Sequence, residues 1–102
     1  MSINVKVEFT GGLELIMKDK AKQATVTLPA LTDGEPTTIR QVILYVRDNL
    51  VADKPQLFST DDTVRPGVLV MINDSDWEVE GDIAYQVQDK DEVIFISTMH
   101  GG

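Results

Sequence analysis

The sequence predicts an α+β fold in which one main helix packs across a mixed sheet of four to five strands. Three observations predict it. Residues 3–9 and 24–28 alternate between apolar and polar side chains, as strands with one solvated face do. Between residues 39 and 50 the apolar side chains recur with the period of a helix. Two later runs, 68–72 and 93–96, are apolar at every position, which is typical of strands inside a sheet.

The first two strands form a predicted hairpin. Gly11-Gly12 is a turn signal after the first strand, and Pro29 ends the second. The return strand begins either at Leu13 or at Gln23, and the pattern leaves both open. The alternating apolar side chains expected to face the core of the first strand are Ile3, Val5, Val7 and Phe9.

A loop at residues 30–36 precedes the helix. Thr38 followed by Gln41 is a capping-box pattern, and Pro55 is the latest possible end of the helix. Its β-branched side chains give it a poor intrinsic helix propensity, so we expect a sheet to receive its apolar face. That face is predicted to consist of Ile39, Val42, Ile43, Val46 and Leu50.

The second half of the chain supplies the remaining strands. A polar loop ends in the turn Arg65-Pro66-Gly67. Residues 68–72 form a strand that either is covered on both faces or leaves an apolar patch beside the C-terminus. Trp77, Val79 and Ile83 are expected to return toward the core as a short strand or irregular segment. Residues 93–96 are expected to be an inner strand covered on both faces and parallel to residues 3–9.

This order of elements is the β-grasp arrangement, in which a helix that follows a hairpin packs across a mixed sheet. The main rival is a ferredoxin-like fold. That fold needs a second long helix, and residues 73–91 are too rich in turn residues to form one. We therefore expect one β-grasp domain at residues 1–97 and a flexible C-terminal tail at residues 98–102.

Composition limits the possible partners. The 102 residues are 42% apolar and 25% charged, as in ordinary globular domains. The net charge of −8 resides in residues 61–92, which hold ten acids and two bases. An acidic surface repels phosphates, so we expect no direct contact with nucleic acid. The acidic stretch either solubilises the chain or attracts a basic partner.

The sequence shows no signal peptide and no membrane span, so the cytoplasm is the expected location, with the nucleus as a second one.

The residue types that usually carry catalysis are scarce. There is no cysteine, and the single histidine, His100, is two residues from the end. No Gly-rich phosphate loop, His/Cys metal cluster or nucleophile elbow occurs, and the carboxylates of residues 74–82 lack the glycine and glutamate of a calcium loop. We expect no catalytic residue, no bound metal or cofactor, and no autonomous enzyme.

The C-terminus, Ser97-Thr98-Met99-His100-Gly101-Gly102, is the remaining candidate for chemistry. A tail of about five residues can extend roughly 17 Å, enough to enter a cleft in another protein. Glycine has no Cβ, so the last two residues can pass a narrow channel in any backbone conformation. A terminal glycine carboxylate is also the least hindered electrophile that a chain offers once it has been adenylated.

Nearly the whole chain resembles the ubiquitin-related modifier family of eukaryotes, whose members act as sulfur carriers and as protein modifiers. The family usually has leucine where this chain has Met99, a similar flexible apolar side chain. The segments that carry the resemblance are Val5-Lys6-Val7-Glu8-Phe9, Gly11-Gly12, Val64-Arg65-Pro66-Gly67, Val70-Met71-Ile72-Asn73-Asp74-Ser75-Asp76-Trp77-Glu78, Tyr85-Gln86-Val87-Gln88-Asp89 and Phe95-Ile96-Ser97-Thr98-Met99-His100-Gly101-Gly102.

The resemblance implies a mechanism centred on Gly102. An activating enzyme with a rhodanese domain would adenylate this residue with ATP, and a persulfide sulfur donor would convert it to a thiocarboxylate. A thiolase complex would then use the sulfur on the wobble uridine of certain tRNAs, or Gly102 would be joined to lysines of target proteins. Gly101, His100, Met99 and Thr98 would bind the activating enzyme. Two alternatives remain open: a small sulfur carrier for thiamine or molybdopterin synthesis, and a non-covalent ubiquitin-like interaction module.

Overall fold

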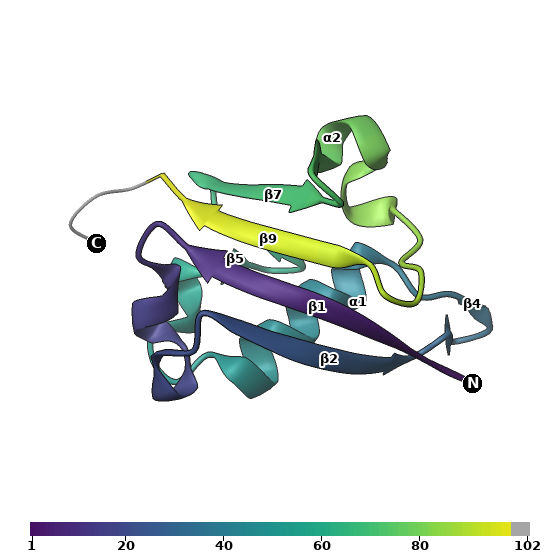
Figure 1. Ribbon diagram of the computed structural model, residues 1–102, viewed down its shortest axis with the longest axis horizontal. Coiled ribbons are helices and arrows are strands. Elements are labelled where there is room, and N and C mark those ends of the chain that lie inside the picture. Colours follow the sequence, from purple (N-terminus) through teal and green to yellow (C-terminus); the bar gives the residue numbers. More distant parts are fainter. Residues whose placement is uncertain (99–102) are drawn as a thin grey trace.

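The structure is a computed structural model that describes residues 1–98, and its centre is a five-stranded mixed sheet in the order β2-β1-β9-β7-β8 (Figure 1). β1 pairs with β2 as an antiparallel hairpin, while β9 runs parallel to β1 and antiparallel to β7. This topology confirms the predicted β-grasp fold. The strands of the sheet are β1 (Ser2–Thr10), β2 (Gln23–Pro29), β7 (Val68–Ile72), β8 (Ser75–Asp76) and β9 (Glu92–Ser97).

The return strand of the first hairpin starts at Gln23, which decides between the two predicted beginnings. Residues after the Gly11-Gly12 turn instead form two 3₁₀ turns, η1 (Leu13–Ile16) and η2 (Lys18–Lys20). These turns still place Leu13 and Met17 in the core, because both side chains are buried. The apolar residues at positions 13 and 17 therefore mark buried positions, although this segment is not a strand.

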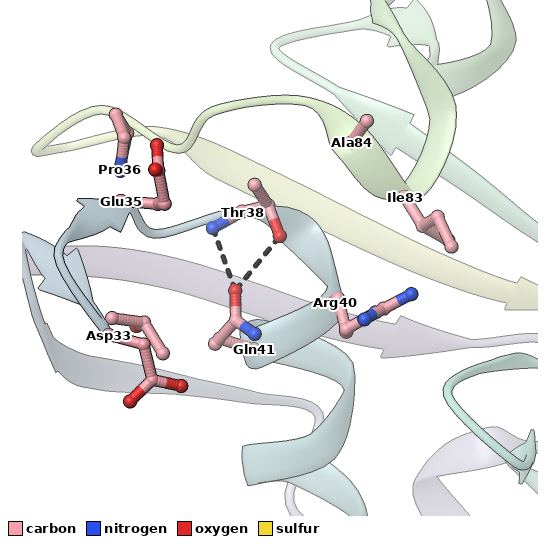
Figure 2. A pocket seen from close by; sticks show the side chains of 9 residues that line it. Asp33, Glu35, Pro36, Thr38, Arg40, Gln41, Ile83 and Ala84 are labelled. Carbon is pink, nitrogen blue, oxygen red and sulfur yellow. Dashed lines mark hydrogen bonds between the residues drawn. The ribbon is translucent and has the colours of Figure 1, made fainter.

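The main helix, α1 (Ile39–Tyr45), begins at the predicted cap. The side-chain oxygen of Gln41 accepts hydrogen bonds from the backbone N–H of Thr38, at 3.0 Å, and from the Thr38 hydroxyl, at 2.9 Å (Figure 2). These bonds satisfy polar groups that a helix start otherwise leaves unpaired. α1 lies across one face of the sheet (Figure 1), and the predicted apolar side chains Ile39, Val42, Ile43 and Val46 are fully buried.

After Tyr45 the helix widens into a π-helical turn, η3 (Val46–Leu50). The N–H of Val51 closes this turn on the carbonyl of Val46 at 3.0 Å. Leu50, the last residue of this turn, packs against the core and is half-buried where full burial was predicted. The helix thus ends five residues before Pro55.

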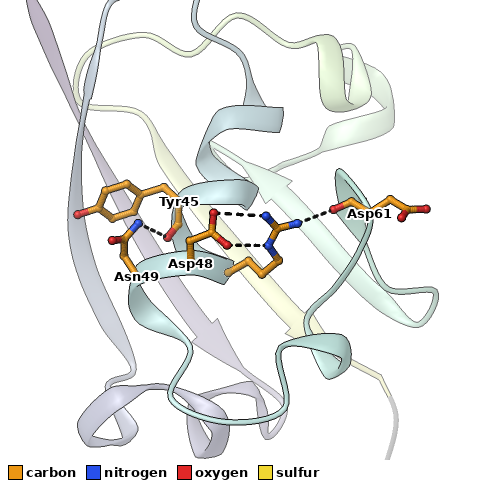
Figure 3. A network of polar contacts seen from close by, with 5 residues as sticks. Tyr45, Asp48, Asn49 and Asp61 are labelled. Atoms are coloured by element: carbon orange, nitrogen blue, oxygen red, sulfur yellow. Dashed lines mark hydrogen bonds and ion pairs between the residues drawn. The ribbon is translucent and has the colours of Figure 1, made fainter.

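An arginine ties the end of this helix to the next loop. The Arg47 guanidinium donates to the carbonyl oxygen of Asp61 at 3.0 Å and to the Asp48 carboxylate at 2.9 and 3.3 Å (Figure 3). The hydrogen bond from Arg47 lowers the pKa of Asp48 below its ordinary value. The groups are exposed, so we assign them a role in orienting the loop and little stabilisation.

The segment predicted as a polar loop after the helix contains a core residue that the sequence analysis missed. Phe58 is fully buried, and its ring lies 5.1 Å from that of Phe95 and 6.5 Å from that of Phe9. The adjacent pair Leu57-Phe58 is isolated from other apolar residues and has no periodicity, so the pattern gave no signal. The short elements around it are η4 (Pro55–Leu57), β5 (Ser59–Thr60) and β6 (Thr63–Val64), and the earlier loop holds the small hairpin β3 (Leu31–Thr32) and β4 (Glu35–Pro36).

Residues 77–84 are helical, contrary to the predicted short strand or irregular segment. They form α2 (Trp77–Glu80) and η5 (Asp82–Ala84), and the Asp76 carboxylate caps α2 by accepting from the N–H of Glu78 at 2.9 Å. Trp77 is buried as predicted. Val79, however, is 77% exposed, so its predicted place in the core was wrong. The helical turn explains why Trp77 is buried while Val79 is exposed. Residues two apart share a face in a strand, but they lie on different faces in a helix.

A buried carboxylate fixes the start of β9. Asp91 is only 6% exposed and accepts hydrogen bonds from the Tyr85 hydroxyl at 2.7 Å, the Gln88 N–H at 2.8 Å and the Asn73 side-chain amide at 2.9 Å. The same Asn73 side chain accepts from the N–H of Glu92 at 2.9 Å. Since these bonds tie the loop before β9 to the end of β7, the register of the central strand is fixed from its first residue.

Candidate functional site at the end of the central strand

The C-terminal residues that are predicted to carry the chemistry follow the central strand in the sequence. β9 lies between β1 and β7, and its last residue, Ser97, pairs with Val68 of β7. Of the predicted site residues, Thr98 is the one that the structure describes. Met99, His100, Gly101 and Gly102 lie outside the described residues.

Thr98 is hydrogen-bonded to the turn that precedes β7. Its N–H donates to the carbonyl oxygen of Gly67 at 2.9 Å, and its hydroxyl donates to the same oxygen at 2.6 Å. Gly67 has a φ of 98°, a conformation that glycine adopts without strain. The predicted Arg65-Pro66-Gly67 turn therefore supplies an acceptor to the first residue after the sheet.

A second glycine approaches the same point from β1. Thr10 pairs with Ile96, so Gly11 lies beside Ser97. A Cβ added at Gly11 would overlap the carbonyl oxygen of Ser97 and lie 3.0 Å from its nitrogen. The sequence marked both glycines as turn residues only. Their place beside the tail follows from the pairing of β9, which no local pattern reveals.

An apolar strip runs along the outer face of β7 and β9, on the side away from α1. The register pairs Leu69 with Ile96 and Met71 with Ile94. Leu69 is 51% exposed, and the other three are half-buried. This observation decides the alternatives for residues 68–72 in favour of an exposed patch. It also corrects the prediction that 93–96 is covered on both faces.

The strip has a polar border. Thr10 and Glu8 of β1 lie opposite Ile96 and Ile94, and Lys6 forms an ion pair with Glu8 at 3.5 Å. An apolar centre with a polar rim is the usual anatomy of a protein-binding surface. The strip ends at Ile96, two residues before Thr98, so a protein that holds the tail would also meet the strip.

The pocket at the start of α1 offers no comparable chemistry. It is lined by residues of the 32–36 hairpin, the helix start and η5 (Figure 2). Three of its polar side chains already have partners, since Thr38 and Gln41 form the capping box and Arg40 pairs with Asp62 at 2.8 Å. Within residues 1–98, no group of three or more His, Cys, Asp or Glu side chains could hold a metal ion. No helix in that range has the length and apolar character needed to cross a bilayer.

Most of the acidic stretch lies away from the tail. α2 follows β8 near the start of β9, and Figure 1 shows α2 at the end of the sheet opposite the last residues of β9. A partner drawn to the carboxylates of residues 74–82 would therefore approach the opposite end of the sheet.

Comparison with known proteins covers the last four residues as well as nearly all of the rest of the chain. The family model described as Urm1 (Ubiquitin related modifier) matches residues 4–102, which include both terminal glycines. The chain belongs to the ubiquitin-related modifier family. The ubiquitin-related modifier 1 homolog of Dictyostelium discoideum is 51% identical over 98% of this chain and 100% of its own length. Ubiquitin-related modifier 1 of Homo sapiens is 50% identical over 98% of this chain and 96% of its own.

Solved structures of ubiquitin-related modifiers show the same fold. The solution structure of Urm1 from Trypanosoma brucei has a TM-score of 0.73 at 37% identity and covers 99% of this chain and 97% of its own. A more distant protein, CysO of Amycolatopsis orientalis, shares the fold alone, with a TM-score of 0.67 at 18% identity over 96% of this chain and 99% of its own. This CysO protein was solved in a complex with BexX.

Proposed function

We propose that the chain is a ubiquitin-like sulfur carrier and protein modifier that works through the carboxyl group of Gly102. The observation that carries this proposal is the family match, which extends to Gly102 itself. The structure supports it through the position of Thr98, which we call the tail root. Thr98 follows the last residue of the central strand and lies beside an exposed apolar strip. The chain itself supplies the electrophile, and the activating enzyme supplies the catalysis.

The reaction begins with activation of the carboxylate. The Gly102 carboxylate attacks the α-phosphorus of ATP and forms an acyl-adenylate, and pyrophosphate leaves. The terminal sulfur of a persulfide on the rhodanese domain then attacks the acyl carbon and displaces AMP, which gives an acyl disulfide. A second thiol of the enzyme attacks the disulfide, so that the enzyme forms its own disulfide and Gly102 is released as a thiocarboxylate.

Two uses of the thiocarboxylate follow. A tRNA thiolase complex takes the sulfur for the wobble uridine, or a lysine amine of a target protein attacks the acyl carbon and hydrogen sulfide leaves. The carrier contacts the thiolase complex and not the tRNA, in keeping with its net charge of −8. We assign these reactions to the cytoplasm and, as a second location, the nucleus.

The apolar strip is the surface that we assign to the activating enzyme. It is continuous with the tail root through Ile96, so one enzyme surface can hold the strip while its cleft receives the tail. Burying such a strip contributes affinity that four tail residues alone supply poorly. Met99, His100 and Gly101 would then be bound along the channel that leads to the adenylation site.

The test is intact-mass spectrometry after incubation with the activating enzyme, ATP and a persulfide donor. We expect a mass gain equal to the exchange of one oxygen for one sulfur, located in the C-terminal peptide, and no gain when ATP is omitted. A chain that lacks Gly102 should melt at the wild-type temperature and gain no sulfur. An unchanged wild-type C-terminus, or tRNA thiolation supported by the shortened chain, would overturn the proposal.

A further inference from the structure

The end of β9 is held from both sides by glycines of different turns. On one side, the Gly67 carbonyl accepts two hydrogen bonds from Thr98. On the other, the Gly11 backbone lies so close to Ser97 that a side chain at position 11 would overlap the Ser97 carbonyl. We propose that Gly11, Gly67 and Thr98 form a collar that positions the tail root for activation. The inference rests on the proposed function of Gly102.

The first argument for the collar is chemical. The Thr98 hydroxyl and the Thr98 N–H share one acceptor at 2.6 and 2.9 Å, so the side chain and backbone of the same residue are both fixed relative to β7. Neither bond belongs to the sheet, because β9 ends at Ser97. A residue beyond the last strand normally frays, and this pair of bonds opposes fraying at that point.

The second argument is steric. Gly11 and Gly12 both have positive φ values, 71° and 103°, and both lie in the turn after β1. A Cβ at Gly12 would have no neighbour within 4 Å, whereas a Cβ at Gly11 would meet the backbone of Ser97. The lack of a side chain at Gly11 is therefore required by the path of β9, in addition to the turn itself.

The collar matters because the remaining tether is short. Four residues beyond Thr98 can span at most about 14 Å. If the tail root is fixed, the Gly102 carboxylate can reach only a small volume near the apolar strip. The tail then loses less conformational entropy when the enzyme binds it. If the tail root is mobile, this entropy is lost during binding, and the affinity for the enzyme falls. The expected kinetic signature is a higher KM with little change in kcat, since the chemical groups are unaltered.

Two matched pairs of variants test the collar in the full chain. Gly11→Ala and Gly12→Ala both place a side chain on a residue with positive φ, but only the first meets the backbone of Ser97. Thr98→Val removes the hydroxyl and keeps the branched shape, while Thr98→Ser keeps the hydroxyl. Thr27→Val, which removes a 2.7 Å hydrogen bond to Asn4 from the exposed β1–β2 face, is the control for loss of a threonine hydroxyl elsewhere.

ATP–pyrophosphate exchange by the activating enzyme gives KM and kcat for each variant. We expect Thr98→Val to raise KM roughly 3- to 10-fold, the effect of one lost hydrogen bond, and Gly11→Ala to raise KM because its side chain displaces Ser97, both at nearly constant kcat. Gly12→Ala and Thr27→Val should keep the wild-type KM, and Thr98→Ser should restore it. Equal KM values for Gly11→Ala and Gly12→Ala would overturn the collar.

A second readout needs no enzyme, so it separates failure of the collar from failure of the proposed function. The ¹⁵N order parameter of the Thr98 amide in the free chain should be near about 0.85, as in rigid backbone. It should fall in Gly11→Ala and Thr98→Val and stay high in Gly12→Ala. A wild-type value below about 0.6 would overturn the collar. A KM effect of Thr98→Val with an unchanged order parameter would also contradict a positioning role, and it would indicate direct contact of Thr98 with the enzyme.

Discussion

At the scale of single residues, the Asp91 network decides how β9 begins. Its carboxylate is 6% exposed and accepts three hydrogen bonds, from Tyr85, Gln88 and Asn73. Buried carboxylates are tolerated when donors surround them in this way. The sequence marked residues 89–92 as a turn, which is correct locally. It gave no sign that one of these acids is buried, because its donors come from residues 73, 85 and 88.

The network has a consequence for stability at high pH. The pKa of Tyr85 is raised to about 12 from 10.0, first by desolvation and then by its hydrogen bond to Asp91 and the negative charges of Asp91 and Glu80. The folded state thus holds this proton more tightly than the unfolded state. Its contribution is fully present below about pH 10 and is lost as pH rises toward about 12.

We therefore expect the tyrosinate absorbance of the wild type minus that of Tyr85→Phe to titrate near pH 12. Urea unfolding at about pH 9 and about pH 11 should show a steeper loss of stability in the wild type than in Tyr85→Phe. A difference titration centred near 10.0, the ordinary tyrosine value, would show that the Tyr85–Asp91 contact does not hold the proton.

At the scale of elements, β7 and β9 combine two roles in one alternating pattern. Val70, Val93 and Phe95 face the core and are buried, whereas Leu69 and Ile96 form part of the outer apolar strip. Both runs are apolar throughout, so the sequence could not distinguish a covered face from an exposed one. Within residues 1–98 no helix covers the outer face, and this property of the whole sheet leaves the strip open (Figure 1).

The strip predicts a selective effect on activation. Leu69→Ser should raise the KM of the activating enzyme roughly 5- to 20-fold, the cost of one apolar contact in a binding surface, without lowering the melting temperature. Leu31→Ser is the matched control, because Leu31 is 57% exposed and belongs to the small hairpin at the other end of the molecule (Figure 1). Equal KM values for the two variants would place enzyme binding on a different face.

At the scale of the whole molecule, three aromatic rings join distant parts of the chain. Phe9 comes from β1, Phe95 from β9 and Phe58 from the loop after the helix. The centroids of Phe9 and Phe95 are 5.9 Å apart, and Phe58 packs edge-on against both. This cluster packs the parallel strands β1 and β9 against the loop after the helix. The two strands are separated by most of the sequence.

We expect Phe58→Ala to lower the free energy of unfolding by about 3–5 kcal/mol, because it leaves a cavity among buried rings. Such a loss is a large share of the roughly 5–15 kcal/mol that stabilises a domain. Urea unfolding with linear extrapolation measures it. Leu15→Ala, at a residue that is 64% exposed, should change the value by about 0.5 kcal/mol or less. A loss below about 1 kcal/mol in Phe58→Ala would contradict the central place of this ring.

Sequence patterns alone predict the β-grasp order, the Thr38–Gln41 cap, the parallel pairing of the last strand with the first, and the terminal glycines as the candidate for chemistry. These properties follow from local periodicity, from capping chemistry, from the order of the elements and from the pair of glycines at the C-terminus. The tertiary structure decided that Phe58 is core, that residues 77–80 are helical, that one face of β7 and β9 stays open, and that Gly11 and Gly67 flank Thr98. Each of these depends on which segments meet across the sheet, and residues far apart in the sequence meet only after the central strand has paired on both sides.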